Sequence, residues 1–285
     1  MLSYFQAIIM GIVQGVTELF PISSLGHSVI LPKLLGWNVN QNDPFFLDFL
    51  VATHAATALV LFLFFLNDWK LIFLGIFRSL KNRKILESDY HAKLGWLLIA
   101  GTVPAGILGI LFEHKLKSLF ANPQLVAWVL IFNGLMLLGA EYLRRNKKTE
   151  KELNSDKRIS KLTWMKSLQI GMLQCLALIP GFSRTGATIT GGLLAGLSSV
   201  DAARFSFLLA TPIIGAAVVL KLPKFAMHAS GENIGPIIVG TIFAGLFAYL
   251  SVKFLIKYFE TKKLWPFAVY CIVIGVGLSI LFLLR

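Results

Sequence analysis

The chain of 285 residues has a formal net charge of +13, although 14% of its residues are charged and 56% are hydrophobic. The mean hydropathy of +0.74 excludes an ordinary soluble domain and predicts an all-α polytopic membrane protein. The first residues contain no basic stretch and no small-residue cleavage site, so we expect no removable signal peptide. Cys175 and Cys271 lie in apolar segments and are interpreted as packed thiols, not as a disulfide.

Six apolar windows are long enough to cross about 30 Å of hydrocarbon. These predicted transmembrane helices are residues 47–66, 94–112, 125–143, 205–222, 234–258 and 264–284. Two further apolar regions, 4–35 and 164–200, are interrupted in the middle by polar and helix-breaking residues. Each region is either a re-entrant pair of broken helices or a pair of kinked full spans. We favour the re-entrant pairs, because backbone groups freed at a break need partners within the protein.

Basic residues gather on one side of this arrangement. The segments after the first, third and fifth spans hold most of the Lys and Arg, and residues 144–163 form the most basic of them. By the positive-inside rule these segments are cytoplasmic, and both termini lie outside the cell. The charge is therefore interpreted as a topology signal that also contacts anionic membrane lipids, and not as a nucleic-acid site.

Short motifs recur in the same order in the two halves of the chain. Residues 11–14 return as 171–174, 21–24 as 180–183, 49–53 as 207–211, and 101–106 as 240–245. This order predicts a first repeat, residues 1–143, and a second repeat, residues 164–285, joined by the basic cytoplasmic loop 144–163. Each repeat holds one broken pair and three full spans. Because three is odd, we expect an inverted-topology repeat whose broken pairs meet near the membrane midplane, an architecture typical of transporters.

A polar run in the second broken pair gives the strongest indication of a site. Residues 180–188 read Pro-Gly-Phe-Ser-Arg-Thr-Gly-Ala-Thr, within an otherwise apolar region. Arg184 is costly at membrane depth unless it is paired, lines a wet cavity or holds an anion. The surrounding hydroxyl groups and freed backbone N–H groups favour an oxyanion, with phosphate as the leading candidate.

The first broken pair supplies complementary side chains, which are Gln14, Glu18, Ser23, Ser24 and His27. Facing Arg184, they provide the parts needed for metal-assisted or nucleophilic phosphoryl transfer. Simpler interpretations stay open at this point. They are a buried Glu18–Arg184 ion pair without chemistry, a packing histidine, and serines that cap the next helix.

These residues resemble the paired signatures of a known family. Residues 14–27, Gln-Gly-Val-Thr-Glu-Leu-Phe-Pro-Ile-Ser-Ser-Leu-Gly-His, and residues 180–188 are similar to those of the undecaprenyl-diphosphate phosphatase family, the bacitracin-resistance type. The resemblance covers nearly the whole chain, including residues 53–57, 101–106 and 205–209. Two long motifs in order, in a chain of this length, are highly specific.

The resemblance implies an integral membrane hydrolase. Its reaction is hydrolysis of undecaprenyl diphosphate to undecaprenyl phosphate and inorganic phosphate, with a divalent cation, Mg²⁺ or Ca²⁺. The active site would open to the outer face of the bacterial plasma membrane. Such recycling of the lipid carrier serves peptidoglycan synthesis and cell-wall biogenesis, and it confers bacitracin resistance.

The resemblance also implies roles by matched position. Catalytic roles fall on Glu18, Ser24, His27 and Arg184, and substrate binding on Ser23, Ser183, Arg184, Gly186 and Thr188. The cation would be held by Glu18, with Gln14 in support. The family accepts Glu or Gln at position 14, and Gln leaves one carboxylate at this site instead of two. The sequence leaves Ser24, His27 and water as candidate nucleophiles.

Other polar residues have two interpretations each. His54 either lines the site or bonds to a helix carbonyl, and Asp48 is either a second carboxylate of the site or a helix-terminal charge. Asp201 and Arg204, three residues apart, predict an ion pair with each other.

Other functions remain to be weighed against the enzyme. A lipid-phosphate transporter or flippase fits the inverted repeat equally well, but the hydroxyl groups and His27 near Arg184 favour chemistry. A soluble-type acid phosphatase site requires a second histidine shortly after the arginine, and the next one is His228. The oligomeric state stays open, a homodimer included.

Overall fold

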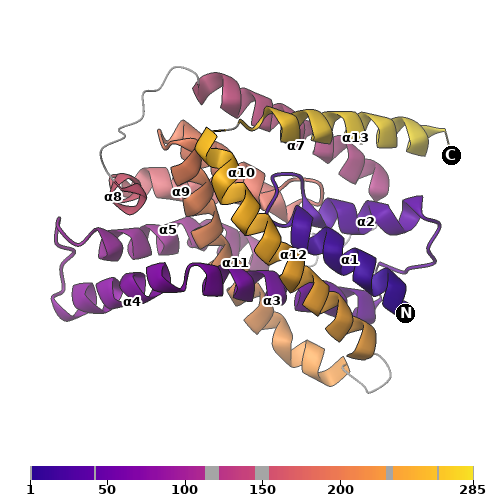
Figure 1. Cartoon of the computed structure of the whole chain (residues 1–285), viewed down its shortest axis with the longest axis horizontal. Helices are drawn as coiled ribbons and strands as arrows, with labels where there is room; N and C mark the ends of the chain where they lie inside the picture. Colours follow the sequence, from indigo (N-terminus) through magenta and orange to yellow (C-terminus); the bar gives the residue numbers. More distant parts are fainter. Residues whose placement is uncertain are drawn as a thin grey trace.

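The computed structural model describes residues 2–41, 43–112, 122–144, 154–228, 234–261 and 263–284. Within these ranges the chain is helical and contains no strand (Figure 1). Six helices are long and apolar enough to cross a membrane: α3 (Pro44–Phe64), α5 (Tyr90–Leu111), α7 (Pro123–Arg144), α11 (Ser199–His228), α12 (Ile234–Thr261) and α13 (Trp265–Leu283). All six predicted spans are confirmed as helices, and the chain is a multi-pass membrane protein.

Each interrupted region consists of two short helices. The first contains α1 (Tyr4–Thr17) and α2 (Ser24–Leu34), and the second contains α9 (Trp164–Gln174) and α10 (Arg184–Leu194). The longest of the four has 14 residues, about 21 Å of helix, which is shorter than the hydrocarbon layer of about 30 Å. A short 3₁₀ helix, Cys175–Leu178, follows α9.

The second helix of each pair begins with the same N-cap interaction. The Ser23 hydroxyl accepts a hydrogen bond from the Gly26 N–H at 3.2 Å, and the Ser183 hydroxyl accepts one from the Gly186 N–H at 3.0 Å. Both serines stand one residue before their helices and satisfy N–H groups that have no partner within the helix. The capping interpretation is therefore correct for Ser23.

The two halves of the chain pack against each other through glycines. Helix α1 packs on α12, and α9 packs on α5 (Figure 1). Gly11 of α1 lies on Gly240 of α12, and Gly171 of α9 lies on Gly101 of α5. A Cβ atom at Gly11 or Gly171 would collide with the carbonyl oxygen of its partner. All four glycines belong to the repeated sequence motifs. The first short helix of each half thus packs on a long helix of the other half, because small residues let the backbones approach.

Two further helices lie in segments that were not predicted to be helical. Helix α4 (Leu66–Lys81) follows α3 and buries Trp69 and Ile72 while Phe73 and Phe77 stay exposed. Helix α8 (Ser155–Ser160) lies within the predicted basic loop 144–163. The apolar residues of α4 recur at helical spacing, so this helix was detectable from the sequence pattern.

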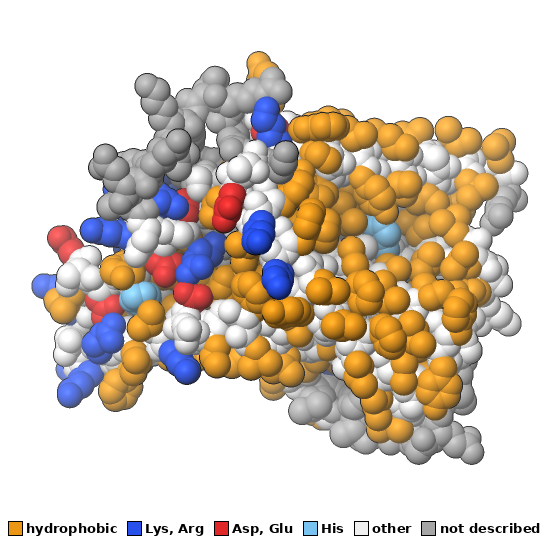
Figure 2. All heavy atoms as spheres, viewed as in Figure 1, with side chains coloured by type: hydrophobic (Ala, Val, Ile, Leu, Met, Phe, Trp, Pro, Cys, Tyr) orange, Lys and Arg blue, Asp and Glu red, His pale blue; other side chains and the backbone are white. Residues whose placement is uncertain are grey.

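Charged side chains gather at one end of the molecule, over α4, α5 and α8, and hydrophobic side chains cover most of the rest of the face in Figure 2. The two marked chain ends lie at the opposite end (Figure 1). Helix α11 passes through the centre of the bundle, and its side chains from Phe205 to Ala210 are fully buried. This helix forms one wall of the site described next.

The predicted ion pair between Asp201 and Arg204 is wrong. Arg158 of α8 donates from Nε and Nη2 to the two carboxylate oxygens of Asp201, at 2.6 and 2.8 Å. Arg204 donates to Asp156 at 2.8 Å and to Asp68 at 2.6 Å. Partners from α4 and α8 come within reach in the folded chain, and their geometry replaces the local contact along the helix.

Candidate functional site

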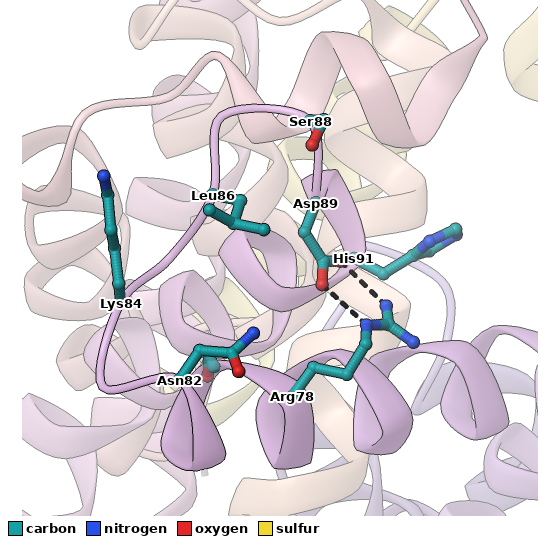
Figure 3. Close-up of a pocket in the computed structure, with 8 residues that line it drawn as sticks. Arg78, Asn82, Lys84, Leu86, Ser88, Asp89 and His91 are labelled. Carbon is teal, nitrogen blue, oxygen red and sulfur yellow. Dashed lines mark hydrogen bonds and ion pairs between the residues drawn. The ribbon is translucent and has the colours of Figure 1, made fainter.

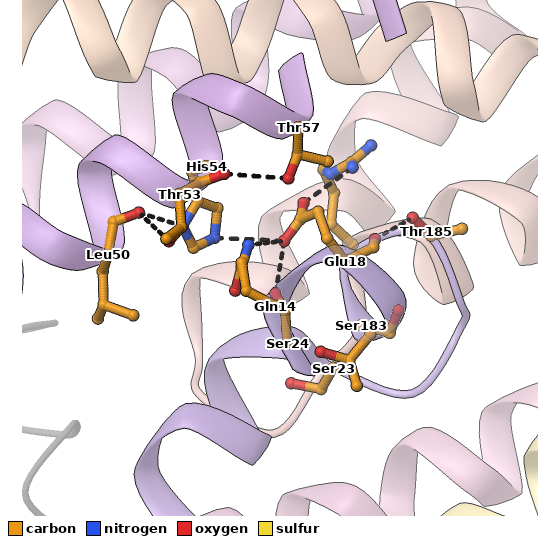
Figure 4. A network of polar contacts seen from close by, with 12 residues as sticks. Gln14, Glu18, Ser23, Ser24, Leu50, Thr53, His54, Thr57, Ser183 and Thr185 are labelled. Atoms are coloured by element: carbon orange, nitrogen blue, oxygen red, sulfur yellow. Dashed lines mark hydrogen bonds and ion pairs between the residues drawn. The ribbon is translucent and has the colours of Figure 1, made fainter. Parts of the chain in front are cut away.

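The carboxylate of Glu18, at the first helix break, is the centre of a buried polar cluster (Figure 4). Its Oε1 accepts a hydrogen bond from Nη2 of Arg184 at 3.0 Å. Its Oε2 accepts from the Ser24 hydroxyl at 2.5 Å and from Nε2 of Gln14 at 3.2 Å, and Nε2 of His54 lies 3.2 Å away. The Glu18 side chain is 6% exposed, and this set of donors compensates for its loss of water.

The two helix breaks are joined by hydrogen bonds that satisfy freed backbone groups. The Thr185 hydroxyl donates to the Glu18 carbonyl oxygen at 3.0 Å. The side chain of Asn133, on α7, bridges the breaks, since Nδ2 donates to the Pro21 carbonyl and Oδ1 accepts from the Ser183 N–H, both at 3.0 Å. The freed backbone groups at both breaks therefore find hydrogen-bond partners within the protein, as polar backbone in an apolar region requires.

Arg184 is the first residue of α10 and does not use all its donors. Besides the bond to Glu18, Nη1 donates to the Ser206 carbonyl at 3.4 Å. Its Nε is buried and has no hydrogen-bond partner among the described residues. The Thr188 hydroxyl lies 2.9 Å from the main-chain carbonyl of Arg184 and 2.6 Å from the Ser206 hydroxyl. A guanidinium with unused donors near two hydroxyl groups is suited to an oxyanion.

Gln14 provides a second unsatisfied atom, because its buried Oε1 has no partner in the described part of the chain. The Nε2 of Gln14 faces the Glu18 carboxylate, so Oε1 is turned away from it. Amide and carboxylate oxygens are both ligands that suit Mg²⁺ or Ca²⁺. The described residues contain no group of three or more His, Cys, Asp or Glu that could hold a metal. A cation held by these two oxygens would take its other ligands from phosphate oxygens and water.

His27 does not join the Glu18 cluster. Its Nδ1 donates to the Ser23 carbonyl at 2.6 Å, and its Nε2 lies 2.7 Å from the Tyr270 hydroxyl. The other predicted binding residues on the breaks, Ser23, Ser183 and Gly186, take part in helix capping. The structure thus brings Gln14, Glu18, Ser24 and Arg184 into one cluster, with Thr188 beside it.

Both interpretations of His54 are correct. Its Nδ1 donates to the Leu50 carbonyl at 2.7 Å, and its Nε2 contacts Glu18 (Figure 4). Acceptors at both ring nitrogens are the pattern of a doubly protonated imidazole. Asn133 and Tyr270 belong to no motif, and their polar character within apolar spans was the one available signal. Ser206 lies in the matched segment 205–209, but no role was predicted for it.

A separate pocket of about 310 Å³ opens at the charged end of the molecule and shares no residue with the Glu18 cluster (Figure 3). Arg78 of α4 donates from Nε and Nη2 to Asp89, just before α5, at 2.9 Å each. These hydrogen bonds lower the pKa of the Asp89 carboxyl group. The pair links two neighbouring helices, and we interpret it as structural.

The fold and the site define a helical membrane protein with a buried Arg–carboxylate cluster at two joined helix breaks. Residues 7–277 match the family of the bacitracin resistance protein BacA. The undecaprenyl-diphosphatase of Mycolicibacterium paratuberculosis (strain ATCC BAA-968 / K-10) is 42% identical over 301 residues, covering 99% of this chain and 98% of the relative. Undecaprenyl-diphosphatase 2 of Chromobacterium violaceum is 44% identical, covering 95% and 96%. The chain belongs to the bacitracin resistance protein BacA family.

Proposed function

We propose that this protein is an undecaprenyl-diphosphate phosphatase, an integral membrane hydrolase that forms undecaprenyl phosphate and inorganic phosphate. The observation that carries the proposal is the buried Arg184–Glu18 pair, with the Ser24 hydroxyl 2.5 Å from the carboxylate. Relatives that match over nearly their whole length are named for this activity. Recycling of the lipid carrier would supply peptidoglycan synthesis and explain bacitracin resistance.

Arg184 would hold the diphosphate. Its unused Nε and its two Nη atoms offer the planar fork that pairs with phosphate oxygens, and Thr188 with Ser206 adds hydroxyl groups on one side. The Nη2 atom of Arg184 that donates to Glu18 already points into the cluster. Substrate oxygens would therefore complete a donor set that the protein alone leaves incomplete.

The contact between Ser24 and Glu18 favours Ser24 as the nucleophile. Its hydroxyl oxygen would form a bond to the terminal phosphorus, its proton would pass to Glu18, and the bond to the bridging oxygen would break. Undecaprenyl phosphate then leaves, and water hydrolyses the phosphoserine to inorganic phosphate. In this second step His27, three residues after Ser24 on α2, would take the proton from water through Nε2 once the Tyr270 hydroxyl releases that nitrogen, and Glu18 would return its proton to the Ser24 oxygen.

A divalent cation would be held by Glu18 and by Oε1 of Gln14. When bound, Mg²⁺ or Ca²⁺ neutralises charge on the phosphate oxygens. We expect an excess of chelator to abolish turnover of the purified protein and added Mg²⁺ or Ca²⁺ to restore it. Full activity in excess chelator would remove this role and leave Glu18 with proton transfer and the pairing of Arg184.

The direct test of the function is release of inorganic phosphate from undecaprenyl diphosphate by the purified protein. We expect turnover by the natural protein and none above background for Ser24→Ala. Ser28→Ala is the matched control, because Ser28 is a buried serine one turn further along α2. A wild-type protein without turnover contradicts the function, and a fully active Ser24→Ala contradicts Ser24 as the nucleophile.

We also propose that the two halves form an inverted-topology repeat in the plasma membrane, with re-entrant helix pairs and a site open to the outer face. Support comes from the short helices of the broken pairs and from the exchanged glycine contacts Gly11–Gly240 and Gly171–Gly101. The charged end in Figure 2 would be cytoplasmic.

Cysteine labelling tests this topology. Single cysteines at Asn38 and Asn122 should react with an impermeant reagent added outside the cell, in a background without Cys175 and Cys271. Cysteines at Asn82 and Ser88 should react after the membrane is opened and not before. Labelling of both sets from one side would refute the proposed orientation.

A further inference from the structure

His27 is held by two partners that come from different parts of the chain. Its Nδ1 is 2.6 Å from the carbonyl oxygen of Ser23, on the preceding turn. Its Nε2 is 2.7 Å from the hydroxyl of Tyr270, on α13, which is 243 residues away in sequence. The two rings also stack, with centroids 5.8 Å apart and planes 12° from parallel. The position and tilt of the imidazole are thus set by both contacts together.

The carbonyl of Ser23 decides how the imidazole carries its proton. A carbonyl oxygen accepts and never donates, so Nδ1 of His27 bears a hydrogen. In the neutral ring Nε2 then has the lone pair, and the Tyr270 hydroxyl donates to it. Nε2 is therefore the nitrogen through which His27 can take a proton, and Tyr270 stands directly at it.

Tyr270 lies on a partly exposed face of α13. Its side chain is 38% exposed, and its α13 neighbours Val269 and Val273 are exposed apolar residues at 42% and 61%. A tyrosine suits this position, since its ring contacts the apolar surroundings while its hydroxyl reaches a polar partner. Packing of the ring alone does not account for the presence of a hydroxyl group at this position. The hydrogen bond to His27 does account for it.

We propose that Tyr270 is a positioning residue for the phosphatase reaction. The Ser23 carbonyl sets the tautomer, and the hydroxyl and stacked ring of Tyr270 hold the imidazole in the orientation in which Nε2 receives the proton of the attacking water. This inference rests on the proposed function, in which His27 is the proton acceptor of the second step. Tyr270 acts through His27, and it hands over Nε2 when water and phosphate occupy the site.

The test compares Tyr270→Phe with the wild-type protein. Phenylalanine keeps the stacked ring and removes the hydroxyl, so folding should be preserved. Loss of one neutral hydrogen bond should lower kcat about three- to tenfold, with KM within about twofold of wild type. Tyr249→Phe is the matched control, because Tyr249 is another exposed tyrosine on a long helix, 46% exposed on α12, and should keep wild-type kcat.

A spectroscopic readout separates positioning from general structural support. The ¹⁵N signals of the histidines in the purified protein report which ring nitrogen carries the hydrogen and whether the other accepts a hydrogen bond. The Nε2 signal of His27 is assigned as the one that is absent from the spectrum of His27→Gln. Tyr270→Phe should shift this signal, and Tyr249→Phe should leave it unchanged. A changed kcat without this shift would show that Tyr270 does not act through His27 and would overturn the inference.

The failure of the inference and the failure of the function have different signatures. Wild-type kcat for Tyr270→Phe, in a preparation whose wild type hydrolyses undecaprenyl diphosphate, refutes the positioning role and leaves the function intact. Absence of turnover in the wild-type protein refutes the function, and the positioning role falls with it. The expected result is an active wild type, an active Tyr249→Phe and a slowed Tyr270→Phe.

Discussion

Among the described residues, the Asp201 and Glu18 clusters each pair an arginine with a buried carboxylate, and they differ in what is left unpaired. At the charged end, Asp201 accepts two bonds from Arg158 and two more from the hydroxyls of Ser155 and Ser198, at 2.5 and 2.7 Å. At the helix breaks, Arg184 donates a hydrogen bond to Glu18 from one Nη atom, and its buried Nε has no partner among the described residues.

The difference has an energetic meaning. Burying a charged pair costs several kcal/mol, which good geometry and additional hydrogen bonds offset. The Asp201 cluster meets that condition within the protein itself. The Glu18 cluster leaves buried donor and acceptor atoms on Arg184 and Gln14, a feature that native structures keep rare. Single buried hydroxyls such as those of Ser28 and Thr190 also lack a partner among the described residues. The Glu18 cluster differs because its unused atoms belong to a guanidinium and an amide next to a carboxylate, a combination that a ligand can complete.

The largest effect is expected at Arg184. Arg184→Lys keeps the charge but loses the planar fork, so phosphate release should fall by at least about a hundredfold, while the protein still inserts and purifies normally. Arg184→Ala should be at least as inactive. Normal hydrolysis by either variant, or a variant that fails to fold, would mean that Arg184 has a structural role and that the active site lies elsewhere in the protein.

The opposite pattern is expected at Arg158. Arg158→Ala leaves the carboxylate of Asp201 buried without its main partner, which should cost about 3 kcal/mol of stability and lower the Tm of the purified protein by several degrees. The fraction that stays folded should keep wild-type kcat, because Arg158 is not part of the Glu18 cluster. A large loss of kcat at unchanged Tm would erase the distinction between the two clusters.

A smaller effect is expected at His54. His54→Asn removes one of the groups that face Oε2 of Glu18, and loss of a hydrogen bond to a charged group should lower kcat about tenfold. His91→Asn is the control, because His91 lies 3.8 Å from Asp156 at the charged end. Equal effects of the two substitutions on kcat would mean that His54 has no special relation to the site.

The smallest effect is expected at Ser206. Its hydroxyl lies 2.6 Å from that of Thr188 beside Arg184, and its carbonyl remains available to Arg184 in any variant. Ser206→Ala should therefore raise KM about threefold with little change in kcat, as loss of one neutral hydrogen bond near the substrate predicts. A kcat loss as large as that of Arg184→Lys would assign Ser206 a direct part in the reaction.

Much of the fold was accessible from the sequence, because membrane-spanning helices depend on local composition. Long apolar windows predicted α3, α5, α7, α11, α12 and α13, and prolines with polar neighbours predicted both breaks. Glu18 and Arg184 were predicted to meet because the inverted repeat brings the two breaks together, and Arg184 is costly in an apolar region without a partner. The amphipathic α4 was missed although its pattern is local, since the charged residues around it favoured a loop.

The partners within the site depended on tertiary structure. The sequence by itself determined the spans, the breaks and the charged residues that had to be paired. It did not determine that Asp201 bonds to Arg158, that His54 contacts Glu18, or that Tyr270 holds His27. These contacts join residues from about 40 to 240 positions apart, so helix packing decides them. Spacing along one helix constrains such contacts very little, because a partner on a neighbouring helix offers the same chemistry in better geometry.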